Sequence, residues 1–195
     1  MVQKTVLITG SSRTIGLKFA EKYVKLGWNV IGAARTPATA GKVDLTMSST
    51  TPVHLSPRSI AVKELGDKAI DVLINNAGIY IDSGTLASTT KDDLLKQFEV
   101  NTIGPFLVTR AFTLQLWPST DQQMLSKSRR LAIDLKKDKI GAFVMRPGWV
   151  QTDMNNGSGA ITTDTSVNGL VSVIGKLTLQ DTGKFYNYAG KTYPW

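Results

Sequence analysis

Cysteine and histidine are almost absent from this chain of 195 residues, which contains no Cys and the single His54. The absence of Cys excludes disulfides, a thiolate nucleophile and Cys-ligated metal, and a lone His cannot form a cluster of ligands. We therefore expect no metal site. Ser-His nucleophilic catalysis could use only His54, and no motif surrounds that residue.

Long apolar runs are also missing. No stretch approaches the roughly 18 apolar residues that cross a bilayer, and the start MVQKTVLITG is too short for the apolar core of a signal peptide. We expect one domain over 1–195, in a cytoplasmic protein with no membrane partner.

Positive charge is in excess, with a formal net charge of +8. Such a charge suits a polyanionic partner, either nucleic acid or a small phosphate-bearing molecule. The basic cluster at 127–137 lies along an amphipathic helix and its end, where cations are solvated and favour the helix dipole. We therefore expect a small phosphate-bearing ligand and no nucleic acid.

Strand and helix patterns alternate along most of the chain. Apolar runs bounded by glycine predict strands, and apolar residues at helical spacing predict helices between or after them. The expected strands are 5–9, 29–33, 70–74, 141–145 and 184–188, and the main helices follow Gly10 and span 94–114 and 164–177. This order predicts an α/β fold, a Rossmann-like, doubly wound parallel sheet. Residues 36–60 are rich in Thr, Ser and Pro, and only 53–55 is expected to form a strand there.

The segment 101–135 lacks a strand pattern. Its apolar spacing predicts that the helix over 94–114 stops before Pro118 and that a second helix follows over 121–136. The sheet would then be shorter by one central strand. Because unpaired buried backbone is costly, we expect 141–145 to pair directly with 70–74.

A glycine-containing turn follows the first strand. In Thr9-Gly10-Ser11-Ser12-Arg13-Thr14-Ile15-Gly16, Gly10 permits a tight turn and Gly16 permits close helix–sheet approach. The free N–H groups at the start of the following helix suit a pyrophosphate. The motif indicates a dinucleotide-binding turn, although an ordinary glycine turn has the same residue pattern.

Further motifs occur in a characteristic order. TGSSRTIG at 9–16 is followed by NNAG at 75–78, by Asn101 in NTIG and by PGWVQTDM at 147–154. Together they resemble the short-chain dehydrogenase/reductase family over most of the chain. The C-terminal GKFYNYAGKTYPW resembles its branch of small carbonyl reductases.

The resemblance implies a nicotinamide cofactor across the carboxyl ends of the strands. By position in the motifs, it assigns three groups of residues to three parts of the cofactor. The phosphates and nearby ribose are assigned Gly10, Ser12, Arg13, Ile15 and Gly16; the adenosine side Asn76, Ala77 and Gly78; and the nicotinamide end Pro147, Gly148, Val150 and Thr152. Arg110 is also carried over from the family pattern.

Charge after the second strand favours NADP(H) over NAD(H). Folds that select NAD usually place an acid there for the ribose 2′-hydroxyl, whereas this chain has Ala33-Ala34-Arg35. The guanidinium of Arg35, and a second from Arg13, match the oxygens of a 2′-phosphate. Thr14 departs from the family pattern, because it stands where the middle glycine is expected and could obstruct the pyrophosphate.

The catalytic pattern of the family is missing. In the family, a strand ends near a catalytic Ser, and a Tyr-x-x-x-Lys pair on the next helix protonates the carbonyl oxygen. None of the five Tyr residues here has Lys four positions later. Gln123 to Lys127 could be a relic of the pattern, or Lys127 could be a solvated helix residue. Asn101, which supports a water of the proton relay in the family, remains.

Three functional interpretations stay open. The chain could be an NADPH-dependent reductase of small carbonyl or alcohol compounds, impaired or using Tyr186 or Tyr188 as a substitute acid. It could be a non-catalytic NADP(H)-binding sensor or dimer partner. It could also be a truncated gene or splice product that lacks internal segments. The resemblance further suggests a homo-oligomer formed through 94–114 and 121–136.

Overall fold

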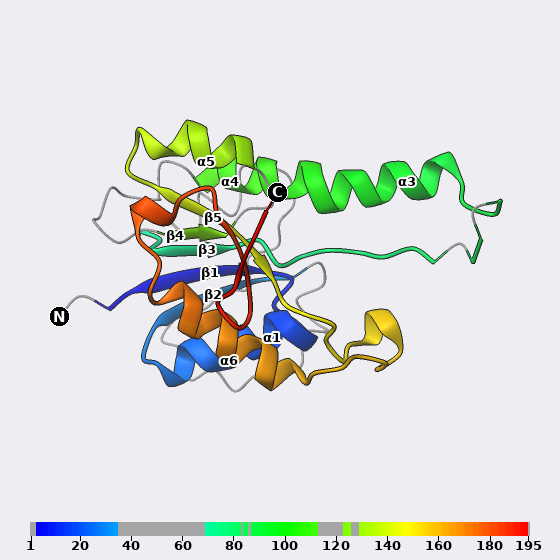
Figure 1. Cartoon of the computed structure of the whole chain (residues 1–195), viewed down its shortest axis with the longest axis horizontal. Helices are drawn as coiled ribbons and strands as arrows, with labels where there is room; N and C mark the ends of the chain where they lie inside the picture. The colour runs from blue at the N-terminus through cyan, green and yellow to red at the C-terminus, as the bar shows by residue number, and fades with distance from the viewer. Residues whose placement is uncertain are drawn as a thin grey trace.

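The structure is a computed structural model, and it describes residues 3–34, 69–82, 84–85, 87–112, 123–125 and 129–194 (Figure 1). Arg35, the strand expected at 53–55 and Lys127 lie outside the described residues. No helix within the described ranges has the length and apolar character needed to cross a bilayer.

The strands in the described part of the chain form a seven-stranded sheet, in the order β2-β1-β3-β4-β5-β6-β7. All neighbouring strands are parallel except β6 and β7. The strands are β1 (Thr5–Thr9), β2 (Asn29–Ala33), β3 (Val72–Ile74), β4 (Gln123–Leu125), β5 (Gly141–Arg146), β6 (Phe185–Asn187) and β7 (Thr192–Tyr193). The Rossmann-like parallel sheet predicted from the alternating pattern is confirmed, and β1 and β2 have their predicted bounds.

Strand β4 corrects the expectation of direct pairing across the centre of the sheet. Its Met124 is in register with Leu73 of β3 on one side and with Ala142 of β5 on the other. Both neighbours are interior strands whose backbone groups need partners, and three residues of β4 supply them. The expected helix over 121–136 is correspondingly shorter, because α5 begins only at Arg129.

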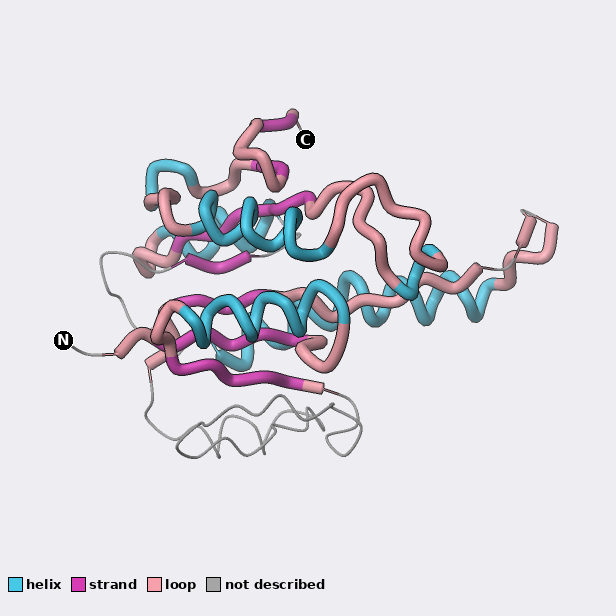
Figure 2. The backbone as a smooth tube through the Cα atoms, turned by 90° about the horizontal axis from the view of Figure 1, so that it is seen from below, coloured by secondary structure: helices cyan, strands magenta, loops and turns pink. Residues whose placement is uncertain are grey.

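Helices cover both faces of the sheet (Figures 1 and 2). The helices α1 (Thr14–Lys25) and α6 (Thr163–Ile174) lie on one face, and α4 (Gly104–Phe112) and α5 (Arg129–Lys136) lie on the other. Two short 3-10 turns, η3 (Asp153–Asn155) and η4 (Leu179–Asp181), precede α6 and β6. The chain leaves α1 through Gly27, whose φ of 78° is the left-handed conformation expected after a helix.

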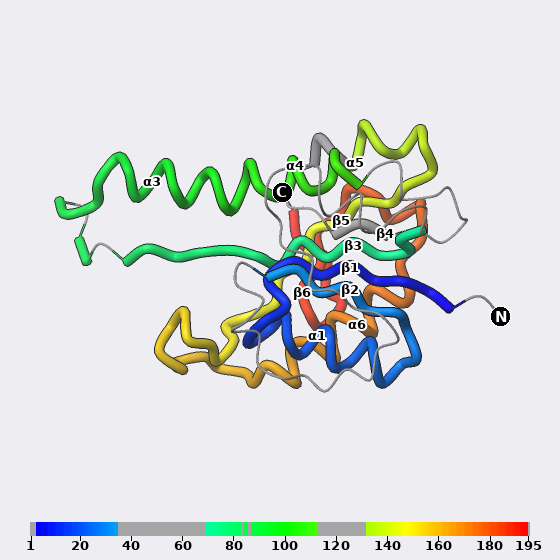
Figure 3. Tube along the Cα trace, turned by 180° about the vertical axis from the view of Figure 1, so that it is seen from behind, coloured from blue at the N-terminus to red at the C-terminus, as the bar shows by residue number. Residues whose placement is uncertain are grey.

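The expected helix over 94–114 is present, but it has a different start and an interruption. It begins as α3 (Lys91–Phe98), passes through one π-helical turn, η2 (Glu99–Ile103), and continues as α4. Thr90 caps α3 through a reciprocal hydrogen-bond pair with Asp93. None of the residues of α3 is buried, and the helix extends away from the sheet (Figure 3).

The two faces of the sheet carry separate apolar cores. Alternate strand residues point to opposite faces, so Val6 and Ile8 of β1 pack with α1 and α6, whereas Leu7 packs with α4 and α5. Tyr23 and Leu170 belong to the first core. This two-sided burial agrees with the continuous apolar pattern of β1.

Ile140 offers a direct test of the second core. Its side chain is 1% exposed among α5 and β5 residues, whereas Ile133 on α5 is 66% exposed. We expect Ile140→Ala to lower the free energy of unfolding by about 2–5 kcal/mol, because it removes buried methyl groups and leaves a cavity. The matched Ile133→Ala should change it by less than about 0.5 kcal/mol in the same denaturant titration. Equal effects at the two positions would contradict the assigned packing.

Candidate functional site

Three loops meet at the carboxyl edge of the sheet. They follow β1, β3 and β5, whose parallel course brings their carboxyl ends to the same edge. Strand β2 pairs with one side of β1, and β3 pairs with the other side. The direction in which strands are added to the sheet therefore reverses between β1 and β3, and the ends of these two strands form a switch point. Ligands of doubly wound folds bind at such a point.

Hydrogen bonds join the ends of β1 and β3. The Thr9 hydroxyl accepts from the N–H groups of Asn76 and Ala77 at 3.0 and 3.1 Å. In return, the Asn76 side chain donates to the carbonyls of Thr9 and Gly10 at 3.1 and 3.2 Å. The NNAG turn is thereby held against the turn that precedes α1.

Gly10 and Gly16 allow the backbone approach that the sequence predicted. Gly10 has a φ of 68°, and a Cβ there would lie 2.9 Å from the Ala77 Cα. A Cβ on Gly16 would overlap the carbonyl of Gly10 and the Asn76 amide. Any side chain at Gly16 would therefore separate α1 from the end of β1.

Thr14 has an unfavourable backbone conformation at the start of α1. Its φ of 44° lies in the left-handed region, where a β-branched residue is rare. This is the position at which the motif analysis expected a glycine. Thr14 thus adopts a conformation suited to glycine, at a conformational cost.

The loop after β5 is held by internal contacts. Gly148 turns the chain with a φ of 90°, and the Ser166 hydroxyl donates to the Pro147 carbonyl at 2.7 Å. Val150 is buried and forms an isolated bridge with Ile161. These contacts fix the direction in which the following residues cross the site.

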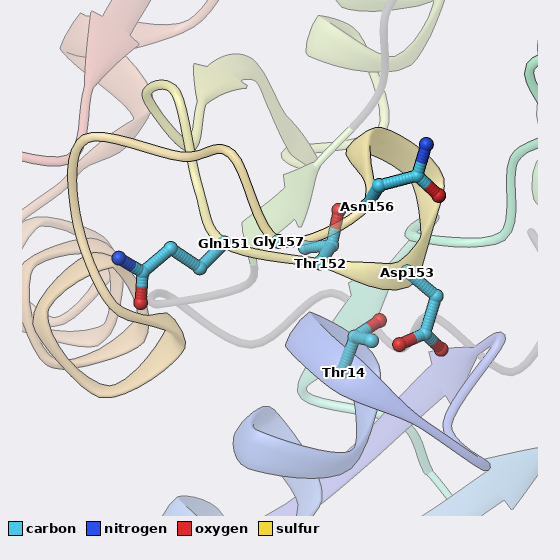
Figure 4. Close-up of a pocket in the computed structure, with 6 residues that line it drawn as sticks. All are labelled: Thr14, Gln151, Thr152, Asp153, Asn156 and Gly157. Carbon is cyan, nitrogen blue, oxygen red and sulfur yellow. The ribbon is translucent and has the colours of Figure 1, made fainter.

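A cavity of about 600 Å³ lies between the amino end of α1 and the loop after β5 (Figure 4). It is lined by Thr14, Gln151, Thr152, Asp153, Asn156 and Gly157. The cavity therefore joins the phosphate-binding turn predicted at 9–16 to Thr152, which was assigned to the nicotinamide end. Within the described ranges, no group of three or more His, Cys, Asp or Glu side chains could hold a metal ion.

The remaining residues of the predicted turn have different surroundings. Ile15 packs against the first core, and Ser12 is half-buried. Arg13 is exposed, and its guanidinium lies 3.5 Å from the Asp153 carboxylate. Gly78 lies beside Asn101, because a Cβ on this glycine would be 3.2 Å from the Asn101 Oδ1.

Asn101 lies in the π-helical turn and binds backbone. Its Oδ1 accepts from the Ile79 N–H at 2.9 Å, and its Nδ2 donates to the Ile79 carbonyl at 2.8 Å. This pair ties η2 to the chain just after the NNAG turn. Arg110 is placed elsewhere, on the exposed face of α4, with its guanidinium carbon 5.7 Å from the centre of the Phe106 ring.

The two candidate substitute acids differ in location. Tyr186 donates to the Asp181 carboxylate at 3.2 Å, and Asp181 precedes β6 near the amino-terminal half of β5. Burial, followed by the charge of Asp181, raises the pKa of Tyr186, whereas a hydrogen bond from Lys184 is the main cause that lowers the pKa of Asp181 to about 2. Tyr186 thus directs its hydroxyl away from the cavity. The ring of Tyr188 packs against Gly148, because a Cβ on this glycine would be 2.9 Å from the Tyr188 Cε1.

Sequence reasoning missed the polar residues that organise these loops. Thr9 and Asn155 carry no assignment in the motifs, yet Thr9 joins β1 to β3 and the Asn155 side chain bonds both the Thr152 N–H and the Val150 carbonyl. The spacing Thr152-x-x-Asn155 is a capping pattern and could have revealed the second role. The location of Thr9 at a strand end has no such local signal.

Comparison with known proteins identifies relatives along the whole chain. The family model described as "short chain dehydrogenase" matches residues 4–124. The short-chain dehydrogenase srdF of Neurospora crassa is 26% identical over 246 aligned positions that cover 97% of each chain. The C-signal protein of Myxococcus xanthus is 29% identical over 154 residues, covering 65% of this chain and 93% of its own. The alignment with srdF is longer than 195 residues, so that relative contains segments without a counterpart here.

Solved structures share the fold. An NADPH-bound carbonyl reductase from chicken fatty liver superposes with a TM-score of 0.84 at 22% identity, covering all of both chains. The carbonyl reductase Sniffer of D. melanogaster does so with a TM-score of 0.85 at 21% identity, again with full coverage.

Thr14→Gly should stabilise the protein. Relief of about 1–2 kcal/mol of left-handed strain exceeds about 0.5–1 kcal/mol of added freedom in the unfolded chain. We expect the midpoint of thermal unfolding to rise by about 1–4 °C. Thr163 is a matched control, because it also begins a helix and is not among the residues with positive φ. Thr163→Gly should lower the midpoint, and a fall for Thr14→Gly would contradict the strain assignment.

Proposed function

We propose that this chain, which belongs to the short-chain dehydrogenase/reductase family, is an NADP(H)-binding oxidoreductase of small carbonyl or alcohol compounds. The observation that carries the proposal is the meeting of the loops after β1, β3 and β5 at the carboxyl edge of the sheet, where the start of α1 and the loop after β5 line a cavity. The carbonyl reductases with the same fold, one of them solved with NADPH bound, support the choice of substrate class and cofactor.

The residues around the cavity fit a dinucleotide. Helix α1 has no side-chain cap at Arg13, so the N–H groups of its first turn are available to a phosphate. Ser12 and Gly10 would lie along the same phosphates, Asn76 to Gly78 along the adenosine side, and Gly148 to Thr152 along the nicotinamide. A bound nicotinamide would supply or accept the hydride.

Charge supports NADP(H) as the cofactor. Ala33 ends β2, and the next residues are Ala34 and Arg35, with no acid at the position that binds the ribose 2′-hydroxyl in NAD-selective folds. Arg13 already lies 3.5 Å from Asp153, which lines the cavity. Two guanidinium groups would suit the 2′-phosphate.

The proton donor is the weak part of this site. No Tyr-x-x-x-Lys pair exists in the sequence, and the Tyr186 hydroxyl is engaged by Asp181. Both polar atoms of the Asn101 side chain are hydrogen-bonded to the backbone of Ile79, and an amide is not a proton-donating acid. We therefore propose that hydride transfer is slower than in relatives with the complete pattern, by about 10²- to 10⁴-fold.

Cofactor binding is tested by the midpoint of thermal unfolding. NADPH at 100 times its dissociation constant adds about 2.7 kcal/mol, so the midpoint should rise by about 5–10 °C. NADH at the same concentration should raise it less, and Arg35→Ala should reduce this difference. A cooperative transition that neither nucleotide moves would exclude the proposed function, and an unchanged preference in Arg35→Ala would exclude only the role of Arg35.

The missing acid also favours a second candidate, a nucleotide-binding protein without turnover that acts as a sensor or dimer partner. Oxidation of NADPH with a panel of small aldehydes and ketones separates the two candidates. Slow turnover supports the reductase, and binding without turnover supports the sensor. An intact mass well above 21.2 kDa for the protein from its native source would identify this chain as a truncated product.

Exposed apolar residues on α3, η2 and α4 support a homo-oligomer. Six of them are 39–57% exposed: Leu94, Leu95, Phe98, Ile103, Phe106 and Leu107. Phe98 and Ile103 are five residues apart, whereas side chains on one face of an α-helix are three or four apart. The π-helical turn adds one residue to the helix here, and the Gly104 N–H donates to the Glu99 carbonyl. The six residues, which we name the apolar stripe, therefore stay on one side.

A second copy suits the apolar stripe because its ends differ in charge. Asp92 and Asp93 follow Lys91 at the start of α3 and leave that end with a net negative charge, whereas Arg110 is the only charged residue of α4. In an antiparallel pair related by a two-fold axis, the acidic end of each copy meets the basic end of the other. We propose such a homodimer.

Phe98→Glu should convert the dimer to a monomer, because two buried carboxylates would face each other across the axis. The measurement is the mass in solution by sedimentation equilibrium. Ile133→Glu is the control, since it adds the same charge at an exposed position on α5 and should leave the mass unchanged. A monomeric wild type, or a dimer that survives Phe98→Glu, would contradict this arrangement.

A further inference from the structure

The charge of the cavity is opposite to what its proposed ligand needs. Among the described residues that line it, Asp153 alone is charged, and it is an acid. The other lining side chains are neutral and polar, apart from Gly157. A carboxylate in a cavity that takes a phosphate-bearing molecule repels that molecule unless a cation neutralises it.

The neutralising cation is Arg13. Its Nη1 lies 3.5 Å from the Asp153 Oδ2, and the two side chains are 61% and 68% exposed. Figure 4 shows the Asp153 carboxylate directed toward Thr14 at the start of α1. The ion pair therefore joins the turn before α1 to the loop after β5, and its acidic partner lines the cavity.

We infer that Asp153 is an affinity-determining residue that occupies Arg13 until a ligand phosphate replaces its carboxylate. This inference rests on the proposed function, because it assigns a role at the same site. Both partners are exposed, so the pair is weak and a doubly charged phosphate can displace the carboxylate. The exchange costs binding affinity, and it releases the Asp153 carboxylate from Arg13.

A second ion pair provides the matched control. Lys18 of α1 lies 3.5 Å from Asp164 of α6, and the Asp164 side chain is 67% exposed. The two acids therefore have the same exposure and the same pairing distance to a cation of the α1 region. Only Asp153 lines the cavity, so Asp164→Asn removes one negative charge without altering the lining.

The test is the dissociation constant of NADPH, NADH and inorganic pyrophosphate, measured by calorimetry on the full chain. We expect Asp153→Asn to tighten NADPH and pyrophosphate by about two- to fivefold, the range of an exposed ion pair. Asp164→Asn should change each constant by less than about 1.5-fold. In the background of Arg13→Gln, competition for the guanidinium is gone and only direct repulsion of the phosphate by the Asp153 carboxylate is left. A smaller gain from Asp153→Asn in that background than in the wild type supports the exchange, and an equal or larger gain overturns it.

The outcomes separate this inference from the proposed function. If wild type binds NADPH and Asp153→Asn binds all three molecules no more tightly, the inference is wrong and the function stands. If neither nucleotide binds but Asp153→Asn still tightens pyrophosphate, the inference stands and the function is wrong. An equal gain in Asp164→Asn would assign the effect to net charge and overturn the inference.

Discussion

The hydrogen bonds between the ends of β1 and β3 are the constraint on which the site depends. They join the Thr9 hydroxyl to the NNAG turn and the Asn76 amide to the carbonyls of Thr9 and Gly10. The backbone ladder between β1 and β3 ends at Ile8 and Ile74, and these bonds continue the connection into the loops that follow. Helix α1 begins just after this joint, and its first residue, Thr14, lines the cavity.

The close approach of the turn before α1 to the NNAG segment imposes a second constraint. Glycine satisfies it at two positions, whereas Thr14 satisfies it only with an unfavourable backbone conformation. Gly10 and Gly16 allow the turn and α1 to touch the NNAG segment, and no other residue would fit at Gly16 without displacement. Thr14 adopts a conformation that suits glycine and keeps its side chain at the cavity. Conformational strain is therefore stored at the place where the ligand is expected, as is common at functional sites.

The acidic side chain at the cavity disfavours a phosphate-bearing ligand, although the net positive charge of the chain favours one. The chain has a net charge of +8, which attracts anions over a distance. At the cavity itself, Asp153 faces Arg13, and one turn along α1 Lys18 faces both Glu21 and Asp164. Arg13 and Lys18, two cations in the described residues around the start of α1, are thus each paired with an acid. Binding of a phosphate depends on exchange between partners more than on free positive charge.

The sequence by itself determined the elements whose signals are local. Buried strands such as β1 and the glycines at 10 and 16 follow from side-chain periodicity and backbone sterics, which short segments contain. The order of the motifs carries the family resemblance, which is also present in the sequence alone. Only the tertiary structure decided the central strand β4, the direction of Tyr186 toward Asp181 and the pairing of Arg13 with Asp153. Segment 123–125 forms a strand because β3 and β5 need backbone partners, and Arg13 meets Asp153 because two loops 140 residues apart end at one sheet edge. Such demands arise between distant segments, and no local pattern records them.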